Sequence, residues 1–192
     1  MEEHGEEPEI GIGEAAFYGP KIDFMASDSL GREWQVATIQ LDVNLPQRFD
    51  LTYISPEGRD ENVVMIHAAI MGSIERYMSI LIEHYAGNFP VWLAPVQVKL
   101  LSVSESHGEY CHSLAAEMKG KGIRVEVDTA NDTVGNKIRK STQEKVPYLL
   151  VIGDKEMNSE KLFVRERGER EAKEWDREEF IESVIRMSKE RK

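Results

Sequence analysis

The sequence predicts a mixed α/β (α+β) protein in two parts: an antiparallel sheet that leads into one long helix, and then a small α/β domain. Three observations predict this. β-rich runs with turn signals fill most of the first half, the element order in the second half is βαβαββα, and two prolines, Pro90 and Pro95, interrupt the pattern between the halves. We therefore expect two domains, residues 1–94 and 95–192.

The first half is predicted to begin with strands. The turn signal Asp28–Gly31 separates two β-rich runs, of which the second is Trp34–Val43, so the pair is typical of an antiparallel hairpin. A third strand is predicted at residues 63–67. Apolar residues at spacings of three and four then predict a helix from Ile70 to Tyr85, and Gly87 follows it as a C-cap would.

The second half alternates strands and helices. The run 147–152 is almost continuously apolar, as in a strand buried on both faces, and Asp176 with Glu179 resembles a capping box at the start of the last helix. A small mixed sheet is expected. The predicted strands are 96–103, 123–127, 147–152 and 161–167, and the predicted helices are 105–119, 133–145 and 176–189.

Composition excludes several classes of protein. Hydrophobic residues make up 41% and charged residues 31% of the 192 residues, which is typical of a globular protein with a core. No apolar run is long enough for a membrane span, and the Glu-rich start is the reverse of a secretory signal. The single cysteine, Cys111, excludes an internal disulfide and indicates a reducing, cytoplasmic setting.

The charge is distributed unevenly. The net charge of -11 argues at first against a nucleic-acid partner. Residues 1–94, however, hold 5 Lys+Arg and 16 Asp+Glu, whereas residues 95–192 hold 19 of each. The second half is therefore neutral, and its local basic groups, which include Lys137, Arg139 and Lys140, permit RNA binding.

Polar residues in the first half are candidates for a site. His67 ends an apolar strand, where an imidazole can bind zinc or move a proton, although a lone histidine there is more often a core residue with a satisfied hydrogen bond. Ser73 and Arg76 share a helix face, and the guanidinium could clamp a phosphate or simply be solvated. Gln35 and Gln40 are five apart on a strand, so a common site would need a bulge or twist.

Two other patterns are weaker. Residues 11–16 faintly resemble a dinucleotide-binding loop, but no strand precedes them. His107, Cys111 and His112 could form a metal cluster on a helix, but no second group of ligands follows at a zinc-site spacing.

The sequence contains six further motifs: Ala16–Phe24, Arg32–Gln35, Thr38–Asp42, Met65–His67, Gly72–Arg76 and Trp92–Gln97. Together they resemble those of the threonyl-tRNA synthetases, a family of class II aminoacyl-tRNA synthetases. They occur in the family's order and separations, and the resemblance runs from about residue 12 to the C-terminus. It implies the C-terminal portion of a class II catalytic domain, with an antiparallel sheet, followed by an α/β anticodon-binding domain.

The resemblance implies ATP-dependent activation of threonine and its transfer to tRNA(Thr). Gly72–Arg76 is then the third class II motif, and Lys21 and Arg76 are the implied catalytic residues. The implied cofactors are Zn²⁺, with His67 as one ligand, and Mg²⁺, with ATP as substrate. In the family, zinc binds the amino and hydroxyl groups of threonine, which rejects valine strongly. The implied threonine-binding residues are Tyr18, Gln40 and His67, and the nucleotide-binding residues are Gln35, Thr38, Ser73 and Arg76.

The second half resembles the family's anticodon-binding domain. Asn131, Arg139, Glu156 and Arg165 lie where the family contacts anticodon bases, and such side chains suit the exposed edges of loop bases. The implied partners are tRNA(Thr), threonine, ATP and, in the full-length enzyme, a second copy in a homodimer, with no membrane.

The sequence departs from the family's pattern in places. The first two class II motifs and two further zinc ligands are missing, so we expect the chain to be a fragment, a truncated form or one product of a split gene, and to be inactive alone. Ala68 and Thr133 stand where the family commonly has basic residues. The alternatives are a non-catalytic accessory module that binds tRNA or another RNA, and a dimerisation element. The family's site residues, retained here, favour the enzyme lineage.

Overall fold

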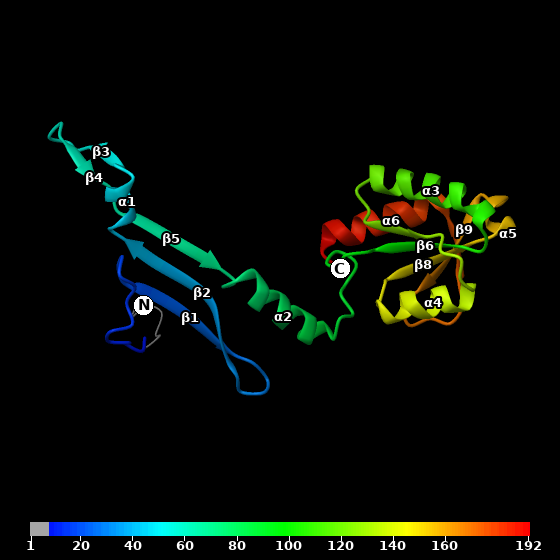
Figure 1. The fold of residues 1–192 in the computed structure, drawn as a ribbon, viewed down its shortest axis with the longest axis horizontal. Coiled ribbons are helices and arrows are strands. Elements are labelled where there is room, and N and C mark those ends of the chain that lie inside the picture. Colours follow the sequence, from blue (N-terminus) through cyan, green and yellow to red (C-terminus); the bar gives the residue numbers. More distant parts are fainter. Residues whose placement is uncertain (1–7) are drawn as a thin grey trace. The chain divides into compact units, whose positions relative to one another are not determined.

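A computed structural model describes residues 8–192, and these divide into two compact units between Ile80 and Leu81 (Figure 1). We call the described residues up to Ile80 unit 1 and residues 81–192 unit 2. Helix α2 (Ile74–Tyr85) begins in unit 1 and ends in unit 2. None of the helices among residues 8–192 has the length and apolar character needed to cross a membrane.

Unit 1 is built on a three-stranded antiparallel sheet. Its strands are β1 (Lys21–Ser27), β2 (Glu33–Asp42) and β5 (Met65–Ile70), in the order β1-β2-β5. The predicted hairpin is confirmed. Its turn is fixed by the carboxylate of Asp28, which accepts hydrogen bonds from the backbone amides of Leu30 and Arg32, both at 2.9 Å.

A second, smaller hairpin in unit 1 was not predicted. Strands β3 (Thr52–Ile54) and β4 (Asp60–Asn62) pair antiparallel, and a single turn of helix, α1 (Leu45–Arg48), precedes them. The turn between the two strands places Gly58 at a φ of 74°, a conformation that glycine adopts without strain.

The predicted boundary between the third strand and the long helix was wrong. Strand β5 continues to Ile70, and α2 begins only at Ile74. Gly72 separates the two elements at a φ of 67°, and a Cβ atom there would lie 2.8 Å from the carbonyl oxygen of Gln35. The predicted helix end is confirmed, because Gly87, at a φ of 75°, donates its amide to the Ile82 carbonyl at 3.0 Å.

Unit 2 contains the predicted mixed sheet, with one more strand than expected. The strand order is β10-β9-β8-β6-β7, in which β7, β6 and β8 are parallel and β9 and β10 are antiparallel. Strand β10 and the short helix α5 (Asp154–Met157) were not predicted. The strands are β6 (Val98–Ser102), β7 (Val125–Asp128), β8 (Tyr148–Ile152), β9 (Lys161–Glu166) and β10 (Lys173–Asp176).

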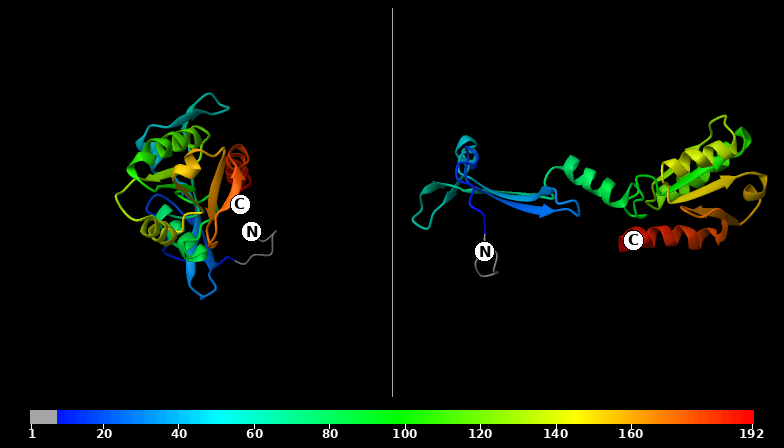
Figure 2. Two further views of the ribbon diagram at one scale, coloured as in Figure 1. Left: turned by 90° about the vertical axis from the view of Figure 1, so that its right-hand side faces the viewer. Right: turned by 90° about the horizontal axis from the view of Figure 1, so that it is seen from below.

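Helices cover both faces of the central strands of unit 2 (Figures 1 and 2). A short 3₁₀ turn, η2 (Glu105–His107), leads into α3 (Gly108–Gly120), which packs with α6 (Arg177–Glu190) on one face, and α4 (Val134–Gln143) packs on the other. Asp176 caps α6 as predicted, because its carboxylate accepts the amides of Glu178 and Glu179 at 2.9 and 3.1 Å. The core includes Leu100, Leu114, Met118, Leu150, Val164, Phe180 and Val184.

The segment after α2 is fixed to unit 2 by cationic side chains that donate to its backbone carbonyls. Arg124 donates to Ala94 at 2.8 Å and to Trp92 at 2.7 Å, and Arg167 donates to Phe89 at 2.9 Å. Since hydrogen bonds with a charged donor are stronger than neutral ones, this proline-containing segment is an ordered part of unit 2.

Candidate functional site

Three polar residues of unit 1 form a row across its sheet. Lys21 of β1 lies opposite Gln40 of β2, and Gln40 lies opposite His67 of β5. Residues directly opposite in antiparallel strands have side chains on the same face. Tyr18, just before β1, has its ring centroid 6.3 Å from that of His67. The structure therefore brings together the three implied threonine-binding residues, Tyr18, Gln40 and His67. Lys21, one of the two implied catalytic residues, lies beside them.

The imidazole of His67 is held by a carboxylate that the sequence analysis did not identify. Oδ2 of Asp42, a fully buried residue, lies 2.9 Å from Nε2 of His67, and Oδ1 accepts the amides of Asn44 and Leu45 at 2.8 and 2.9 Å. Burial acts to raise the pKa of Asp42, but these hydrogen bonds outweigh it and the pKa is lowered. An ionised carboxylate can only accept, so Nε2 of His67 is the donor in this pair.

Strand β2 contains the bulge that a shared site for the two glutamines requires. Phe24 pairs with Ala37, but the next residue, Met25, pairs with Gln35, so the register shifts by one residue at Val36. The shift allows Gln35 to donate from Nε2 to Oγ1 of Thr38 at 2.6 Å. The expectation that Gln35 and Gln40 could lie on one face only through a bulge is met by this register.

Asp23, a second carboxylate missed from the sequence, joins these groups. Its Oδ1 accepts from Nε2 of Gln35 at 2.7 Å and from Oγ1 of Thr38 at 2.8 Å, and its Oδ2 forms an ion pair with Lys21. The hydrogen bond with Lys21 is the largest cause of a lowered pKa at Asp23 and of a raised pKa at Lys21. The ammonium and the carboxylate therefore stay charged together.

Arg76 approaches the same group from the first turn of α2. Its Nη1 donates to the carbonyl oxygen of Gln35 at 2.9 Å, with Oε1 of that side chain at 3.5 Å. Ser73 is exposed, and its hydroxyl accepts the amide of Arg76 at 3.2 Å, so it caps the helix. Three of the four nucleotide-binding candidates, Gln35, Thr38 and Arg76, thus belong to one hydrogen-bonded chain.

The four candidates in unit 2 occupy separate elements. Asn131 is exposed in the loop after β7, and Glu156 lies in α5 after β8, so both follow the carboxyl ends of parallel strands. Oε2 of Glu156 accepts the amide of Gly153 at 3.0 Å. Arg165 is half-buried on β9, and Arg139 is exposed on α4. Among these four described residues, none hydrogen-bonds to another.

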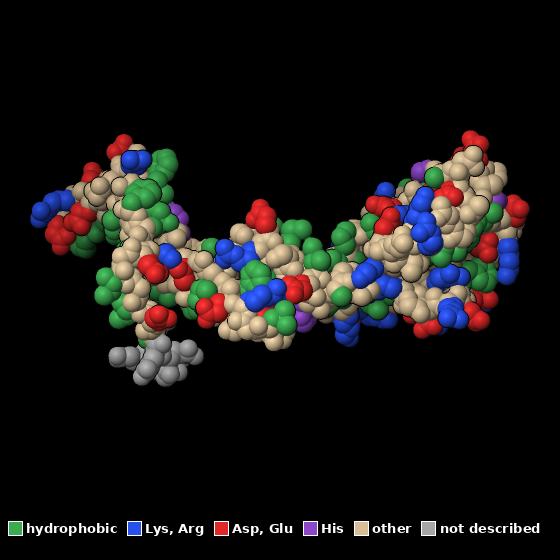
Figure 3. All heavy atoms as spheres, turned by 60° about the horizontal axis from the view of Figure 1, so that its bottom comes forward, with side chains coloured by type: hydrophobic (Ala, Val, Ile, Leu, Met, Phe, Trp, Pro, Cys, Tyr) green, Lys and Arg blue, Asp and Glu red, His purple; other side chains and the backbone are tan. Residues whose placement is uncertain are grey.

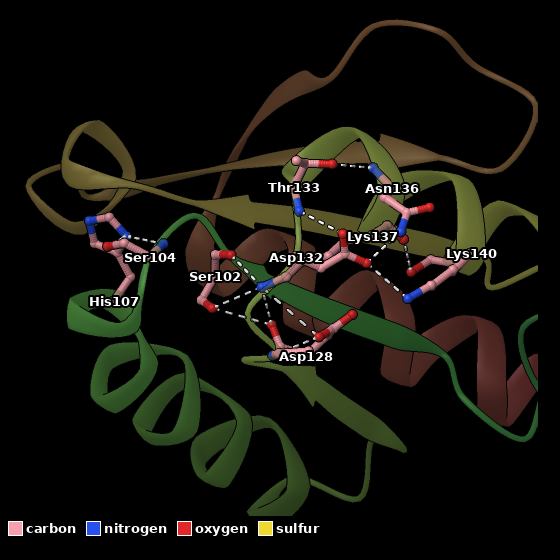
Figure 4. A network of polar contacts seen from close by, with 11 residues as sticks. Ser102, Ser104, His107, Asp128, Asp132, Thr133, Asn136, Lys137 and Lys140 are labelled. Atoms are coloured by element: carbon pink, nitrogen blue, oxygen red, sulfur yellow. Dashed lines mark hydrogen bonds and ion pairs between the residues drawn. The ribbon is translucent and has the colours of Figure 1, made fainter.

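Lys137 corrects one expectation about basic groups. We expected it to be available to RNA, but it is 1% exposed, and its ammonium donates to the Ser102 carbonyl at 2.8 Å and the Asp128 carbonyl at 3.3 Å (Figure 4). It therefore ties the carboxyl ends of β6 and β7 together. Of its neighbours, Lys140 pairs with Asp132 at 2.9 Å and Arg139 remains exposed.

His107 is held by side chains of its own unit. It is 5% exposed, its Nδ1 accepts the amide of Ser104 at 3.1 Å, and its Nε2 lies 3.0 Å from Oδ1 of Asp154. Figure 4 shows it beside Ser104. Among residues 8–192, no three His, Cys, Asp or Glu side chains are placed to hold a metal ion.

Comparisons with known proteins agree with the two units. Residues 5–85 match the family model for the tRNA synthetase class II core domain (G, H, P, S and T), and residues 93–187 match that for the anticodon binding domain. The whole chain is 48% identical to a threonine–tRNA ligase of Carboxydothermus hydrogenoformans, and 96% of it is 48% identical to one of Thermotoga maritima. The chain belongs to the threonyl-tRNA synthetase family.

Solved structures give the same result. The RNA binding domain of threonyl-tRNA synthetase from Cryptosporidium parvum matches 97% of the chain, with 38% sequence identity and a TM-score of 0.75, and 47% of that chain is covered. This chain spans only about 30% of the length of the curated threonyl-tRNA synthetases that it matches. Its mixed α/β architecture agrees with these synthetases, as the sequence predicted.

Proposed function

We propose that this chain serves threonine–tRNA ligation: unit 1 contributes to the site where ATP activates threonine, and unit 2 recognises the anticodon of tRNA(Thr). The observation that supports the first part best is the row Lys21, Gln40 and His67, linked through Asp23 to the nucleotide-side group of Gln35 and Arg76. An amino acid and a nucleotide that react together need adjacent sites, and the sheet residues among these share one face, while Arg76 reaches Gln35 from α2.

His67 fits the role of one zinc ligand. With Asp42 accepting from Nε2, a metal would bind His67 through Nδ1, and a carboxylate behind the imidazole is the usual support for a histidine ligand. When bound, zinc would supply a Lewis acid for the amino and hydroxyl groups of threonine. The remaining ligands would come from outside residues 8–192. Tyr18 and Gln40 would orient the amino acid.

Arg76 fits the role of a phosphate-binding group. The bonds to Gln35 use Nη1, so the other nitrogen donors of the guanidinium remain available for a nucleotide phosphate. Lys21 would add a second positive charge to balance the charge that develops on the phosphate. Mg²⁺ would accompany ATP, because it binds nucleotide phosphates in preference to all-protein sites.

Unit 2 fits the recognition of unpaired bases. Asn131 and Arg165 make no side-chain hydrogen bond or ion pair to any residue that the structure describes, so both are free to bind a base edge. Glu156 has one carboxylate oxygen committed to Gly153 and one free. Arg139 adds an exposed positive charge on α4.

A segment exchange tests the catalytic part. This chain would replace the matching segment of the Carboxydothermus hydrogenoformans relative, and threonine-dependent ATP–pyrophosphate exchange would be measured. We expect the exchanged enzyme to be active, and His67→Ala or Arg76→Ala to lower its activity by at least about a hundredfold, as the loss of a metal ligand or of a transition-state contact does. His84→Ala, an exposed change on α2, is the matched control and should have no effect.

The isolated chain gives the complementary result. We expect it to bind tRNA(Thr) without activating threonine. Robust exchange by the chain alone would refute the view that its catalytic site is partial. An exchanged enzyme that binds tRNA but is inactive with intact zinc and ATP binding would instead favour the accessory RNA-binding module.

A further inference from the structure

One face of strand β9 in unit 2 presents an aromatic ring that the core does not use. Leu162 and Val164 are in the hydrophobic core, so the alternating residues Phe163 and Arg165 lie on the opposite face of the sheet. Helix α4 covers that face over β6 and β8. Phe163 is half-buried on this face, and α5 packs against the same strand (Figure 1).

The ring is covered by a single cationic side chain. The ammonium of Lys155, in α5, lies 4.5 Å from the ring centroid of Phe163. Lys155 is exposed and makes no hydrogen bond or ion pair to another residue that the structure describes. A cation–π contact at an exposed site is weak, so another flat group could displace the ammonium at little cost.

The surroundings of the ring match those of a site for single-stranded RNA. Arg165 follows two residues later on the same face with an unpaired guanidinium, and Glu156 follows Lys155 in α5. Proteins that bind unpaired bases combine an aromatic ring, on which a base stacks, with nearby groups that bind base edges and phosphates. Both kinds of group are present around Phe163.

We propose that Phe163 is a stacking platform for one unpaired base of the anticodon loop, and that Lys155 leaves the ring when the base arrives. This rests on the proposed function of unit 2 as an anticodon-binding unit. Stacking adds binding free energy without selecting a base, whereas the edge contacts select, so Phe163 sets affinity and the orientation in which Arg165 meets the base.

A double-mutant cycle tests the proposal. The 192-residue chain and its Phe163→Leu variant would be titrated with a hairpin RNA that carries the tRNA(Thr) anticodon loop, and with a series of hairpins that each have one abasic loop nucleotide. Leucine keeps the apolar contact with the sheet but removes the π face. We expect Phe163→Leu to weaken binding of the intact hairpin roughly tenfold to a hundredfold, and to have almost no further effect with one particular abasic hairpin.

Two variants serve as controls. Phe163→Tyr keeps the ring and should retain wild-type affinity. Phe89→Leu changes another half-buried phenylalanine, in the segment after α2, and should not alter RNA binding. An equal loss from Phe163→Leu with every hairpin would show a purely structural role and overturn the proposal, as would no loss at all.

The same titrations separate this proposal from the one it rests on. If wild-type chain binds the hairpin and Arg165→Gln weakens it while Phe163→Leu does not, the stacking platform is wrong and anticodon binding stands. If wild-type chain binds the cognate hairpin no better than one with an unrelated loop, the anticodon function itself fails, and the platform fails with it.

Discussion

The two units differ in what holds their functional residues in place. In unit 2, every buried member of the hydrophobic core cluster lies between Val91 and Val184, and the polar candidates lie on elements that pack around that core. In unit 1, large apolar side chains are exposed on the sheet and on α2 (Figure 3). Ile66 of β5 is 68% exposed, and Ile74 of α2 is 76% exposed. There the polar residues are fixed by strand register and by hydrogen bonds to one another.

This difference teaches that a site can be ordered locally without a core of its own. Figures 1 and 2 show neither α1 nor the unit 1 part of α2 over a face of the unit 1 sheet. Asp23 nevertheless connects Lys21, Gln35 and Thr38, and Asp42 connects His67 to the start of α1. We infer that unit 2 folds by itself. We also infer that unit 1 is stabilised when its exposed apolar side chains are buried against other protein residues.

The largest expected effect comes from the core of unit 2. Leu150→Ala should lower the free energy of unfolding of unit 2 by about 3 kcal/mol, because it leaves a cavity in a fully buried position. Ile66→Ala in unit 1 should change stability by less than about 0.5 kcal/mol, since the side chain is mostly exposed. Hydrogen exchange resolved by segment measures both. Equal losses of stability in the two variants would contradict the view that only unit 2 has a hydrophobic core.

A smaller effect is expected at the buried ammonium of unit 2. Lys137→Met should destabilise unit 2 by about 2 kcal/mol, because the buried carbonyls of Ser102 and Asp128 lose their donor. Lys140→Met is the matched control on the same helix, and as an exposed change it should cost under about 0.5 kcal/mol. If the two variants unfold at the same denaturant concentration, the hydrogen bonds from Lys137 to β6 and β7 contribute nothing to the stability of unit 2.

Low pH should destabilise unit 1 by protonating the carboxylates of Asp23 and Asp42. The pKa values of Asp23 and Asp42 are lowered from the ordinary 3.8, so their stabilising contribution is complete above that pH and is lost as pH falls through the lower values in the folded state. Asp23→Asn should remove about 1 kcal/mol at neutral pH and flatten the loss of stability below about pH 4. The measurement is exchange protection of β2 against pH, and an unchanged profile would contradict it.

The smallest effect tests a helix cap in unit 2. The hydroxyl of Thr133 accepts the amide of Asn136 at 3.3 Å at the start of α4. Thr133→Ala should therefore cost about 0.5–1 kcal/mol. Thr142→Ala, near the other end of the same helix, should cost less, because that hydroxyl bonds only to the Ile138 carbonyl one turn back. Thermal unfolding of the two variants gives the comparison.

Most of the fold could be predicted because turns and caps are encoded locally. The Asp28 turn, the Asp176 cap and the Gly87 C-cap all lie where the sequence indicated. Strand β10, Lys173–Asp176, could not be predicted, because three of its four residues are charged and its place depends on pairing with β9. The predicted helix start at Ile70 was wrong because Ile70 and Ile74, although at helical spacing, belong to different elements. Ile70 ends β5, and Ile74 begins α2.

The candidate site was predictable only in part. The resemblance supplied Lys21, Gln40 and His67, and the structure shows them opposite one another. Asp23 and Asp42 were missed because a carboxylate that alternates with apolar residues on a strand has the pattern of a solvent-facing position. Only the pairing of three strands shows that their carboxylates are bonded to other site residues.

The bulge in β2 has a consequence for how insertions and deletions would act. Successive side chains of a strand point to opposite faces of the sheet. The extra residue at Val36 shifts this alternation by one position, so residues before and after it follow opposite patterns. Deleting Val36 would remove the bulge and leave Gln35 two positions before Thr38 on a regular strand, so both side chains would stay on one face. In this strand two functional side chains that are an odd number of residues apart share a face only because of the bulge, and a pair an even number apart would need none.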